Sequence, residues 1–508
     1  MYFLNVLYLS KLRYINNSFY KSALMKNLYK ILLFLCISLI LYNCTKEDEI
    51  PADVEVNDFI WKAMNAYYLY QDQIPDLADR RFNNQPELNS YLRGFATSDE
   101  LFINLLHDRP NTDNNSTLLD DYNLIQQPNI RTSNTHGVEY GIIAEPGNVD
   151  NVIGYVQYIL PNSDATNQPI KRGEFFYAVD NVQLTRDNYR TILEGTTNSY
   201  KLNMAGFDGT TVTPNATKVA LTKTNYTHNP VFMSKNIISG TNNIGYLLYN
   251  NDFSSNYIND LNTAFLQFKN QGVNQLILDL RYNVGGGSFV ENINQIASMI
   301  TGQFTNQPFA KKRWNNKAQS WFELNQPDSL ITKFTNKLNN STTINSLGLT
   351  DVYIILNGSS SSVELLINSL RSHINVHVIN SRTTDGNNTG SITLYNSIDY
   401  DSIGKSTNHT VALQPVVLEF LNNDDETYKN GFTSEIRICT QENILNLGVL
   451  GENSDPILNE VLNFINGTPP STPALCNPNS FDFLYNSVIN QQIIDSGVFI
   501  KQDLPNTN

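Results

Sequence analysis

An alternation of apolar strands and amphipathic helices between residues 243 and 373 most constrains how this chain can fold. The stretches "NIGYLLYN", "QLILDLR" and "VYIIL" have the length and apolar composition of buried strands. Between and after them, "YINDLNTAFLQFKNQG", "FVENINQIASMI" and "VELLINSLRSH" carry apolar residues at helical spacing. The pattern predicts an α/β sheet with crossover helices.

The rest of the chain shows other periodicities. Residues 54–69, "PELNSYLRGF" and "SDELFINLL" have helical spacing, so we expect a helical domain at about 45–136. From Gly137, "GVEYGIIAE" and "VIGYVQYIL" predict a β-rich domain at 137–220. We expect the α/β domain at 230–466 and a loop-like tail at 467–508. A chain of 508 residues has room for these domains.

The N-terminal stretch "MKNLYKILLFLCISLILYNC" has the layout of a secretory signal, with two lysines before an apolar core. It starts at Met25, so residues 1–24 are left out of the fold prediction. Cys44 ends the stretch and resembles the lipidated cysteine of bacterial lipoproteins. The following "TKEDE" resembles the surface-export tether of Bacteroidota-type lipoproteins.

These features predict a cell-envelope protein, lipid-anchored through Cys44 to the outer membrane and facing either the periplasm or the outside. The alternative is an uncleaved membrane anchor in which Cys44 is incidental. After signal removal, Cys439 and Cys476 would lie in an oxidising compartment, and the sequence does not decide whether they pair.

Charge and motifs exclude several classes of function. The net charge is −14 and no long basic cluster occurs, so the sequence predicts no nucleic-acid partner. The histidines are scattered, with no His-Glu-x-x-His, and no Cys-x-x-Cys occurs. We therefore predict neither a metal nor a cofactor.

A glycine-rich turn follows the apolar strand in "LILDLRYNVGGGSF". Consecutive glycines let the backbone approach a reacting group and turn its N–H groups toward it. A phosphate loop would need Lys-Ser/Thr after the last glycine, and here Gly287 is followed by Ser288 and Phe289. A plain strand-to-helix turn remains open.

A run of four serines stands between a strand and a helix in "VYIILNGSSSSVELL". Ser361 and Glu364 have the spacing of a capping box, in which both side chains bind free backbone N–H groups. A serine at a helix start after a buried strand also lies where N–H groups and the helix dipole stabilise an oxyanion. Cap and nucleophile are both open on this stretch alone.

The two stretches together, in this order, resemble the tail-specific (C-terminal-processing) serine peptidase family. The first motif is complete from Asp279 to Gly286, and the second, Ser361 to Glu364, has two positions changed. In addition, "YILPNSDATNQPIKRGEFFYAVDNVQL" resembles the centre of the PDZ domain of such peptidases. The resemblance implies an α+β multidomain fold: a helical front domain, a PDZ-like β domain and an α/β, crotonase-like ββα peptidase core.

By this resemblance Ser361 is the nucleophile of an endopeptidase that works through an acyl-enzyme. The oxyanion hole would be formed by backbone N–H groups of Ser362 and of Gly285 or Gly286. The stretch Gly137, Val138, Glu139 and Tyr140 would form the carboxylate-binding loop of the PDZ-like domain. The implied partners are unfolded or extended polypeptides, held by their C-termini.

The family's lysine base, in a Thr-x-Gly-Lys turn about 25 residues after the serine, is missing. Here "TTDGNNTG" places Asn387 at that position, or Gly386 if the alignment shifts by one, and neither side chain is a base. A further polar helper would fall on Ser391 or a neighbour. Other candidate bases, for which a solvated surface role is the alternative, are His373, His377, Lys311, Lys312 and Lys405.

Two functions therefore follow from the sequence. In one, the chain is a serine endopeptidase that cuts through Ser361. In the other, it is a catalytically degenerate homologue that still binds peptides.

Overall fold

The computed structural model describes residues 50–109, 111–125, 132–250, 253, 255–283, 288–358, 360–434, 442–468, 481–490 and 497–501. The signal segment with Cys44, glycines 285–287 and Cys439 and Cys476 lie outside these residues. The described residues form two compact units: residues 50–58 together with 82–96, and residues 59–81 together with those described from 97 onward. No helix of the described ranges is long and apolar enough to span a bilayer.

Helices dominate residues 55–104, as predicted for this part of the chain. They are α2 (Glu55–Tyr67), η1 (Gln71–Gln73), η2 (Pro75–Leu77), α3 (Gln85–Leu92) and α4 (Ser98–Asn104). The side chains of Asn84 and Thr97 accept hydrogen bonds from backbone N–H groups and begin α3 and α4. The segment predicted as helical also holds η3 (Tyr122–Leu124) and the strands β1 (Thr117–Leu119) and β2 (Thr132–Thr135), whose strand partners lie far along the chain.

A β domain follows, as the change of pattern at Gly137 predicts. Its sheet has the order β22-β3-β4-β5-β7-β8, and β6 pairs with β5. The strands are β3 (Val138–Ala144), β4 (Val152–Ile159), β5 (Phe175–Val179), β6 (Val182–Gln183), β7 (Ser199–Phe207), β8 (Val212–Thr222) and β22 (Phe483–Asn486). The helices η4 (Asp164–Asn167) and α5 (Tyr189–Leu193) belong to the same domain, and β9 (Thr224–Thr227) pairs with β2.

The predicted α/β sheet has the strand order β10-β11-β12-β16-β17. The β10–β11 pair is antiparallel and the others are parallel. Its strands are β10 (Val231–Ser239), β11 (Asn242–Tyr249), β12 (Gln275–Asp279), β16 (Asp351–Ile355) and β17 (Asn375–Ile379). The apolar runs of β12 and β16 are buried because helices cover both faces of this sheet.

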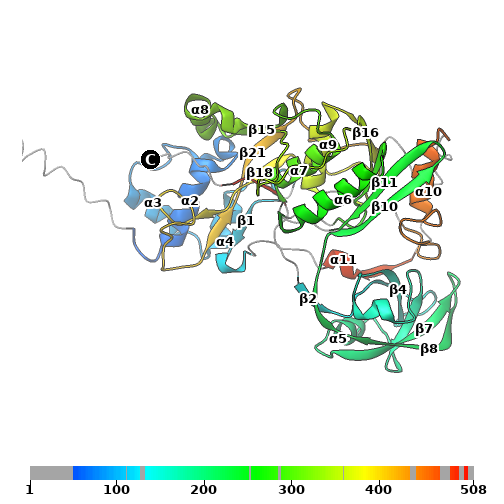
Figure 1. Ribbon diagram of the computed structural model, residues 1–508. Helices are drawn as coiled ribbons and strands as arrows, with labels where there is room; N and C mark the ends of the chain where they lie inside the picture. Colours follow the sequence, from blue (N-terminus) through cyan, green and yellow to red (C-terminus); the bar gives the residue numbers. More distant parts are fainter. Residues whose placement is uncertain are drawn as a thin grey trace, which may run out of the picture. The chain divides into compact units, whose positions relative to one another are not determined.

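Alternation along β11 shows which helix covers which face. Tyr246 and Leu248 pack in one cluster with Leu458 and Val461 of α10 (Pro456–Ile465). On the opposite face a Cβ at Gly245 would touch Phe268 of α6 (Ile258–Asn270). Figure 1 shows α7 (Val290–Ile300) and α9 (Ser361–Arg371) on the α6 side.

Two further sheets accompany this α/β sheet. One has the order β13-β23-β18-β21-β14-β15, and the other β1-β20-β19. The elements are η5 (Ser255–Tyr257), β13 (Ser288–Phe289), β14 (Pro308–Trp314), α8 (Asn316–Asn325), η6 (Pro327–Leu330), β15 (Ile331–Lys333), β18 (Thr389–Ser391), β19 (Leu394–Tyr395), β20 (Ala412–Gln414), β21 (Val416–Leu421) and β23 (Val498–Phe499).

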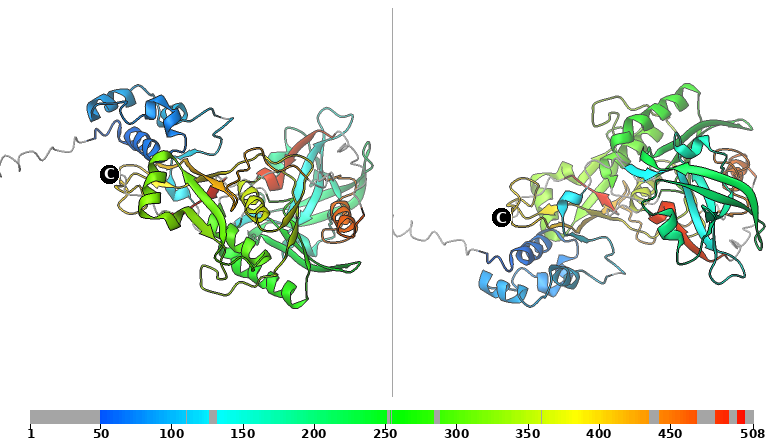
Figure 2. Two further views of the ribbon diagram at one scale, coloured as in Figure 1. Left: turned by 90° about the horizontal axis from the view of Figure 1, so that it is seen from above. Right: turned by 90° about the horizontal axis from the view of Figure 1, so that it is seen from below.

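The C-terminal part is not only loop, so the prediction of a loop-like tail is wrong for two stretches. Residues 483–490 form β22 and α11 (Ser487–Asn490), and β23 inserts between β13 and β18. In both views of Figure 2 the red C-terminal segment lies beside the cyan strands of the β domain. The partner strand of β22, which is β3, lies more than 300 residues away along the chain, and no local pattern reveals such a pairing.

Candidate active site

Ser361 is the first residue of α9, just after the buried parallel strand β16. Ser360 is the residue before the helix, with an extended backbone, and its own side chain makes no capping hydrogen bond. The backbone N–H of Glu364 donates to the Ser360 carbonyl oxygen at 2.9 Å, so Ser360 and not Ser361 holds the position that a capping box needs. The predicted capping box between Ser361 and Glu364 is therefore wrong, because the Glu364 carboxylate has other partners.

Glu364 ties the turn at residues 386–387 to α9. Its carboxylate oxygens accept hydrogen bonds from the backbone N–H groups of Gly386, at 2.6 Å, and of Asn387, at 2.9 Å. The Glu364 side chain is almost fully buried, so these two bonds satisfy a charge that water does not reach. The carboxylate thereby fixes where Asn387 lies relative to Ser361.

Asn387 donates a hydrogen bond to the proposed nucleophile. Its Nδ2 lies 2.6 Å from the Ser361 Oγ. Its Oδ1 accepts from the Thr389 hydroxyl at 2.9 Å and from the Thr389 backbone N–H at 3.4 Å. Because these two donors require an oxygen, the amide orientation follows from the network: the NH₂ group faces the serine.

This orientation has a chemical consequence. A neutral carboxamide nitrogen has no available lone pair, so Asn387 cannot take the Ser361 proton. The Asn115 Nδ2 contacts the Thr389 hydroxyl at 3.3 Å and extends the network. Thr389 and Asn115 were not predicted, and no signal marked Asn115, which lies 274 residues from Thr389.

Gly386, the alternative position for the missing lysine, has no room for a side chain. Its φ is +80°, and a Cβ there would lie 2.3 Å from the Lys429 carbonyl oxygen and 2.7 Å from the Gly431 nitrogen. Both are backbone atoms of a neighbouring turn and cannot rotate away. Of the two positions, the geometry leaves Asn387 beside the serine.

The other predicted polar residues have partners elsewhere or are buried. Ser362 is buried, and its hydroxyl lies 3.0 Å from that of Ser360. Ser391 is buried in β18. Gly285 and Gly286 lie outside the described residues. The five candidate bases bind other groups: His373 the Pro308 carbonyl, His377 Asp351, Lys311 Asp425, Lys312 the Ser329 carbonyl, and Lys405 the face of Tyr122.

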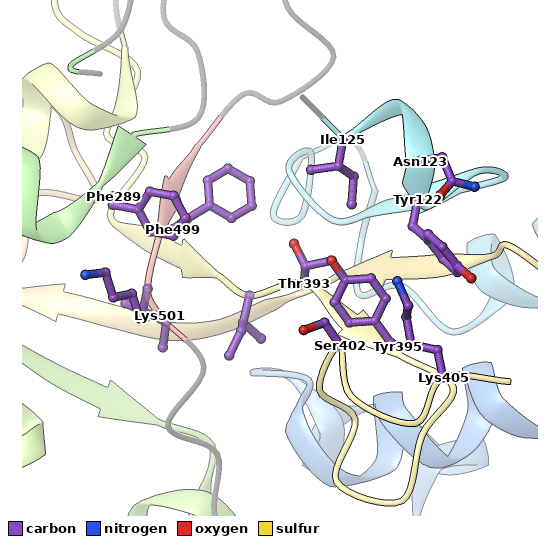
Figure 3. Close-up of a pocket in the computed structure, with 12 residues that line it drawn as sticks. Tyr122, Asn123, Ile125, Phe289, Thr393, Tyr395, Ser402, Lys405, Phe499 and Lys501 are labelled. Atoms are coloured by element: carbon purple, nitrogen blue, oxygen red, sulfur yellow. The ribbon is translucent and has the colours of Figure 1, made fainter. Parts of the chain in front are cut away.

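A cavity of 560 Å³ lies where residues of η3, β13, β19 and β23 meet. It is lined by the side chains drawn in Figure 3, among them Tyr122, Phe289, Tyr395, Phe499 and Lys405. The Lys405 Nζ is 3.9 Å from the ring centre of Tyr122 and 5.0 Å from that of Tyr395. Aromatic walls with a cation suit an apolar or acidic side chain of a bound polypeptide.

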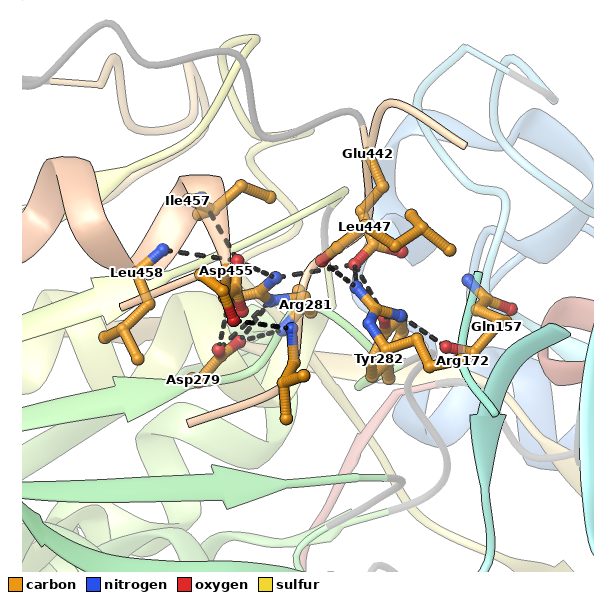
Figure 4. A network of polar contacts seen from close by, with 12 residues as sticks. Gln157, Arg172, Asp279, Arg281, Tyr282, Glu442, Leu447, Asp455, Ile457 and Leu458 are labelled. Carbon is orange, nitrogen blue, oxygen red and sulfur yellow. Dashed lines mark hydrogen bonds and ion pairs between the residues drawn. The ribbon is translucent and has the colours of Figure 1, made fainter. Parts of the chain in front are cut away.

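The first motif forms a buried ionic network (Figure 4). Arg281 is fully buried and contacts Asp279 at 2.7 Å and Asp455 at 2.9 Å. The Tyr246 hydroxyl donates to Asp279 at 2.7 Å. Asp455 also begins α10 by accepting from backbone N–H groups. Asp279 and Arg281 therefore hold the turn after β12 in place.

Arg172 of the β domain joins this network. It contacts Glu442 at 2.5 Å and the Tyr282 hydroxyl at 2.8 Å, and Glu442 also lies 3.4 Å from Arg281. Burial alone would raise the pKa of Glu442, but Arg172 and Arg281 outweigh it and lower that pKa below its ordinary value.

The predicted carboxylate-binding loop begins at Gly137, whose φ is +93°. Three of its backbone N–H groups have partners within the chain. Gly137 donates to the Thr135 hydroxyl, Val138 to the His136 Nδ1, and Tyr140 to the Ser487 Oγ. Glu139 is buried. In the described residues no group of three or more His, Cys, Asp or Glu could hold a metal ion.

Two segments of the chain match known protein families. Residues 243–413 match the model of peptidase family S41, and residues 55–117 match that of the peptidase S41 N-terminal domain. No curated protein sequence matches the chain.

Among solved structures, a candidate S41 protease from Bacteroides fragilis NCTC 9343 is 21% identical over 80% of this chain and 97% of its own, with a TM-score of 0.59. The photosystem II D1 C-terminal processing protease is 15% identical over 80% of this chain and 99% of its own, with a TM-score of 0.42. The chain is thus a mixed α/β multidomain protein that matches peptidase family S41 over residues 243–413 and the N-terminal domain of that family over residues 55–117.

Proposed function

We propose that the chain binds extended polypeptides and hydrolyses them slowly or not at all. The contact between the Asn387 Nδ2 and the Ser361 Oγ carries this proposal. Attack on a peptide carbonyl requires that the serine lose its proton, and a general base typically contributes about 10²–10⁴-fold. Here the hydroxyl oxygen instead accepts a hydrogen bond from a group that cannot take a proton.

The features that bind a polypeptide remain. The cavity lined by Tyr122, Tyr395 and Phe499 has aromatic walls and holds the cation of Lys405. Family S41 membership of the peptidase segment implies polypeptide ligands. Binding without efficient cleavage uses these features and needs no base.

An active serine endopeptidase is the second candidate, and the position of Ser361 favours it. The serine is half-buried at the start of an eleven-residue helix, after a buried strand. Free N–H groups and the helix dipole at such a position stabilise an oxyanion, and with it an acyl-enzyme on Ser361. The N–H group of Ser362 and those of Gly285 or Gly286 would supply the donors.

Binding and cleavage of a fluorescently labelled, permanently unfolded protein separate the two candidates. The wild-type chain should bind it, and its hydrolysis rate should equal that of Ser361→Ala. Rapid hydrolysis that disappears in Ser361→Ala would favour the endopeptidase instead. Absence of any binding to wild type or Ser361→Ala would refute the binding proposal.

We also propose that Cys44 is diacylated and anchors the mature chain to the outer membrane. The support is the Lys-flanked apolar stretch that ends at this cysteine. Mass analysis of membrane-extracted protein should find an acylated Cys44 as the first residue. Intact residues before Cys44 in that protein would refute the anchor.

A further inference from the structure

A strand from the chain's own C-terminal part occupies the outer edge of β3. β22 pairs with β3 in antiparallel register, with Phe483 opposite Ile143, Tyr485 opposite Ile142 and Asn486 opposite Gly141. The addition of an extended segment to a sheet edge is how β-domain grooves bind peptides. The edge available for an extended ligand is therefore filled by residues 483–486.

Tyr485 contacts both β3 and α5. Its ring centre is 5.7 Å from that of Tyr140 on β3 and 6.0 Å from that of Tyr189 on α5. The Arg190 guanidinium lies 5.4 Å from the same ring, and the Tyr485 hydroxyl donates to Glu194. An aromatic ring with a polar tip that contacts strand and helix has the character of a binding anchor.

Ser487, the first residue of α11, follows β22 and contacts the loop predicted to bind a carboxylate. Its Oγ accepts from the Tyr140 backbone N–H at 2.9 Å and donates to the Glu139 carboxylate at 2.5 Å. Glu139 is only 2% exposed. A ligand's terminal carboxylate at this place would face the buried carboxylate of Glu139, whereas a serine hydroxyl satisfies both partners.

We propose that the outer edge of β3 binds internal, uncharged segments of the pattern Tyr-x-Ser, and that residues 483–487 are its intramolecular ligand. The proposal builds on the peptide-binding function above and names the ligand class of this edge. A tethered ligand acts at an effective concentration of about millimolar, so an outside peptide must compete with it.

The test uses a fluorescent peptide with the sequence of residues 481–490 and both ends blocked, titrated into the full chain. Tyr485→Ala weakens the intramolecular ligand and should bind this peptide about tenfold or more tightly than wild type does. The matched variant Tyr485→Phe keeps the ring contacts and should resemble wild type. Equal dissociation constants for Tyr485→Ala and wild type would overturn the proposal.

A disulfide lock gives a readout that does not depend on how well Tyr485→Ala folds. Ile143 and Phe483 face each other across the ladder, so Ile143→Cys with Phe483→Cys can be joined by oxidation. The oxidised double variant should bind the blocked peptide about tenfold or more weakly than its reduced form. Equal affinity of the two forms, with wild type unaffected by reductant, would overturn the proposal.

Two further titrations define the ligand and separate this inference from the function it builds on. A peptide of residues 481–487 with a free C-terminal carboxylate should bind Tyr485→Ala more weakly than its amidated form, and tighter binding would overturn the preference for internal segments. If Tyr485→Ala binds the unfolded protein but not the blocked peptide, only the assignment to the β3 edge fails. If it binds neither, the binding function fails as well.

Discussion

The Asn387 carboxamide has the reach to bind Ser361 and lacks the lone pair to deprotonate it. The motif spacing predicted correctly that Asn387 holds the position of the missing base. It did not predict the role of Glu364, because a Ser-x-x-Glu pattern does not tell whether the carboxylate binds its own helix or a distant turn. Thr389 and Asn115 orient the amide through contacts that only the folded chain creates.

His136 gives a pH dependence at the same scale. Its Nδ1 accepts from the Val138 N–H, so the neutral ring carries its proton on Nε2, toward the Tyr200 hydroxyl at 2.5 Å. Burial lowers the pKa of His136 to about 4, from 6.5. Protonation would end the bond to Val138.

Because the folded pKa lies below the unfolded one, this stability is complete above pH 6.5 and is lost as the pH falls toward 4. The whole loss is about 3 kcal/mol. Urea unfolding between pH 7 and 5, where few carboxylates titrate, measures most of it. His136→Asn keeps an acceptor that does not titrate, and its unfolding free energy should fall less. Parallel pH profiles of wild type and His136→Asn would contradict this account.

At the scale of elements, apolar runs predicted the central strands and the helices α6, α7 and α9, because the spacing of their buried residues is a local feature of the sequence. The strands β22 and β23 were missed, because each is short and exists only through partners brought together by the fold. Turns with positive φ were likewise only partly predictable. The sequence shows which residues are glycines, but it does not show which atoms pack against them in the fold.

Two glycines with similar φ angles allow the cost of backbone strain to be measured separately from the cost of steric crowding. Gly386 (φ +80°) has backbone atoms where a Cβ would lie, whereas Gly404 (φ +68°) has nothing within 4 Å. Gly404→Ala should lower the free energy of unfolding by about 1 kcal/mol through backbone strain alone. Gly386→Ala should lose a further ~1–3 kcal/mol from overpacking. If chemical denaturation showed the same loss of unfolding free energy for both variants, the turn at Lys429 would move at no cost to make room for the new Cβ, which would contradict this account.

At the scale of the whole molecule, the resemblance predicted an N-terminal domain followed by a peptidase domain, and the family matches at residues 55–117 and 243–413 bear out that order. What joins the β domain to the peptidase core was not predictable. Arg172 and Glu442 lie 270 residues apart and meet in a buried network with Arg281. Arg172 belongs to the stretch that resembles a PDZ domain, but nothing in that stretch points to Glu442 as its partner.

Arg172→Met tests that junction. It leaves the buried Glu442 with less compensation, and loss of one partner of a buried ion pair typically lowers the free energy of unfolding by about 3–5 kcal/mol. The matched Lys333→Met removes an exposed pair with Asp328 and should change it by less than about 1 kcal/mol. Similar melting curves for the two variants would contradict a stabilising role of the network.

The central claim is that Ser361 lacks only a base, and Asn387→Lys tests it most directly. The measurement is the rate at which wild type, Ser361→Ala, Asn387→Lys and Asn387→Lys with Ser361→Ala hydrolyse the unfolded protein. The account predicts that wild type does not exceed Ser361→Ala, and that Asn387→Lys gains up to about 10²–10⁴-fold, all of it lost in the double variant. Brisk wild-type hydrolysis that Ser361→Ala abolishes would contradict it, because an unrecognised base would then serve the serine.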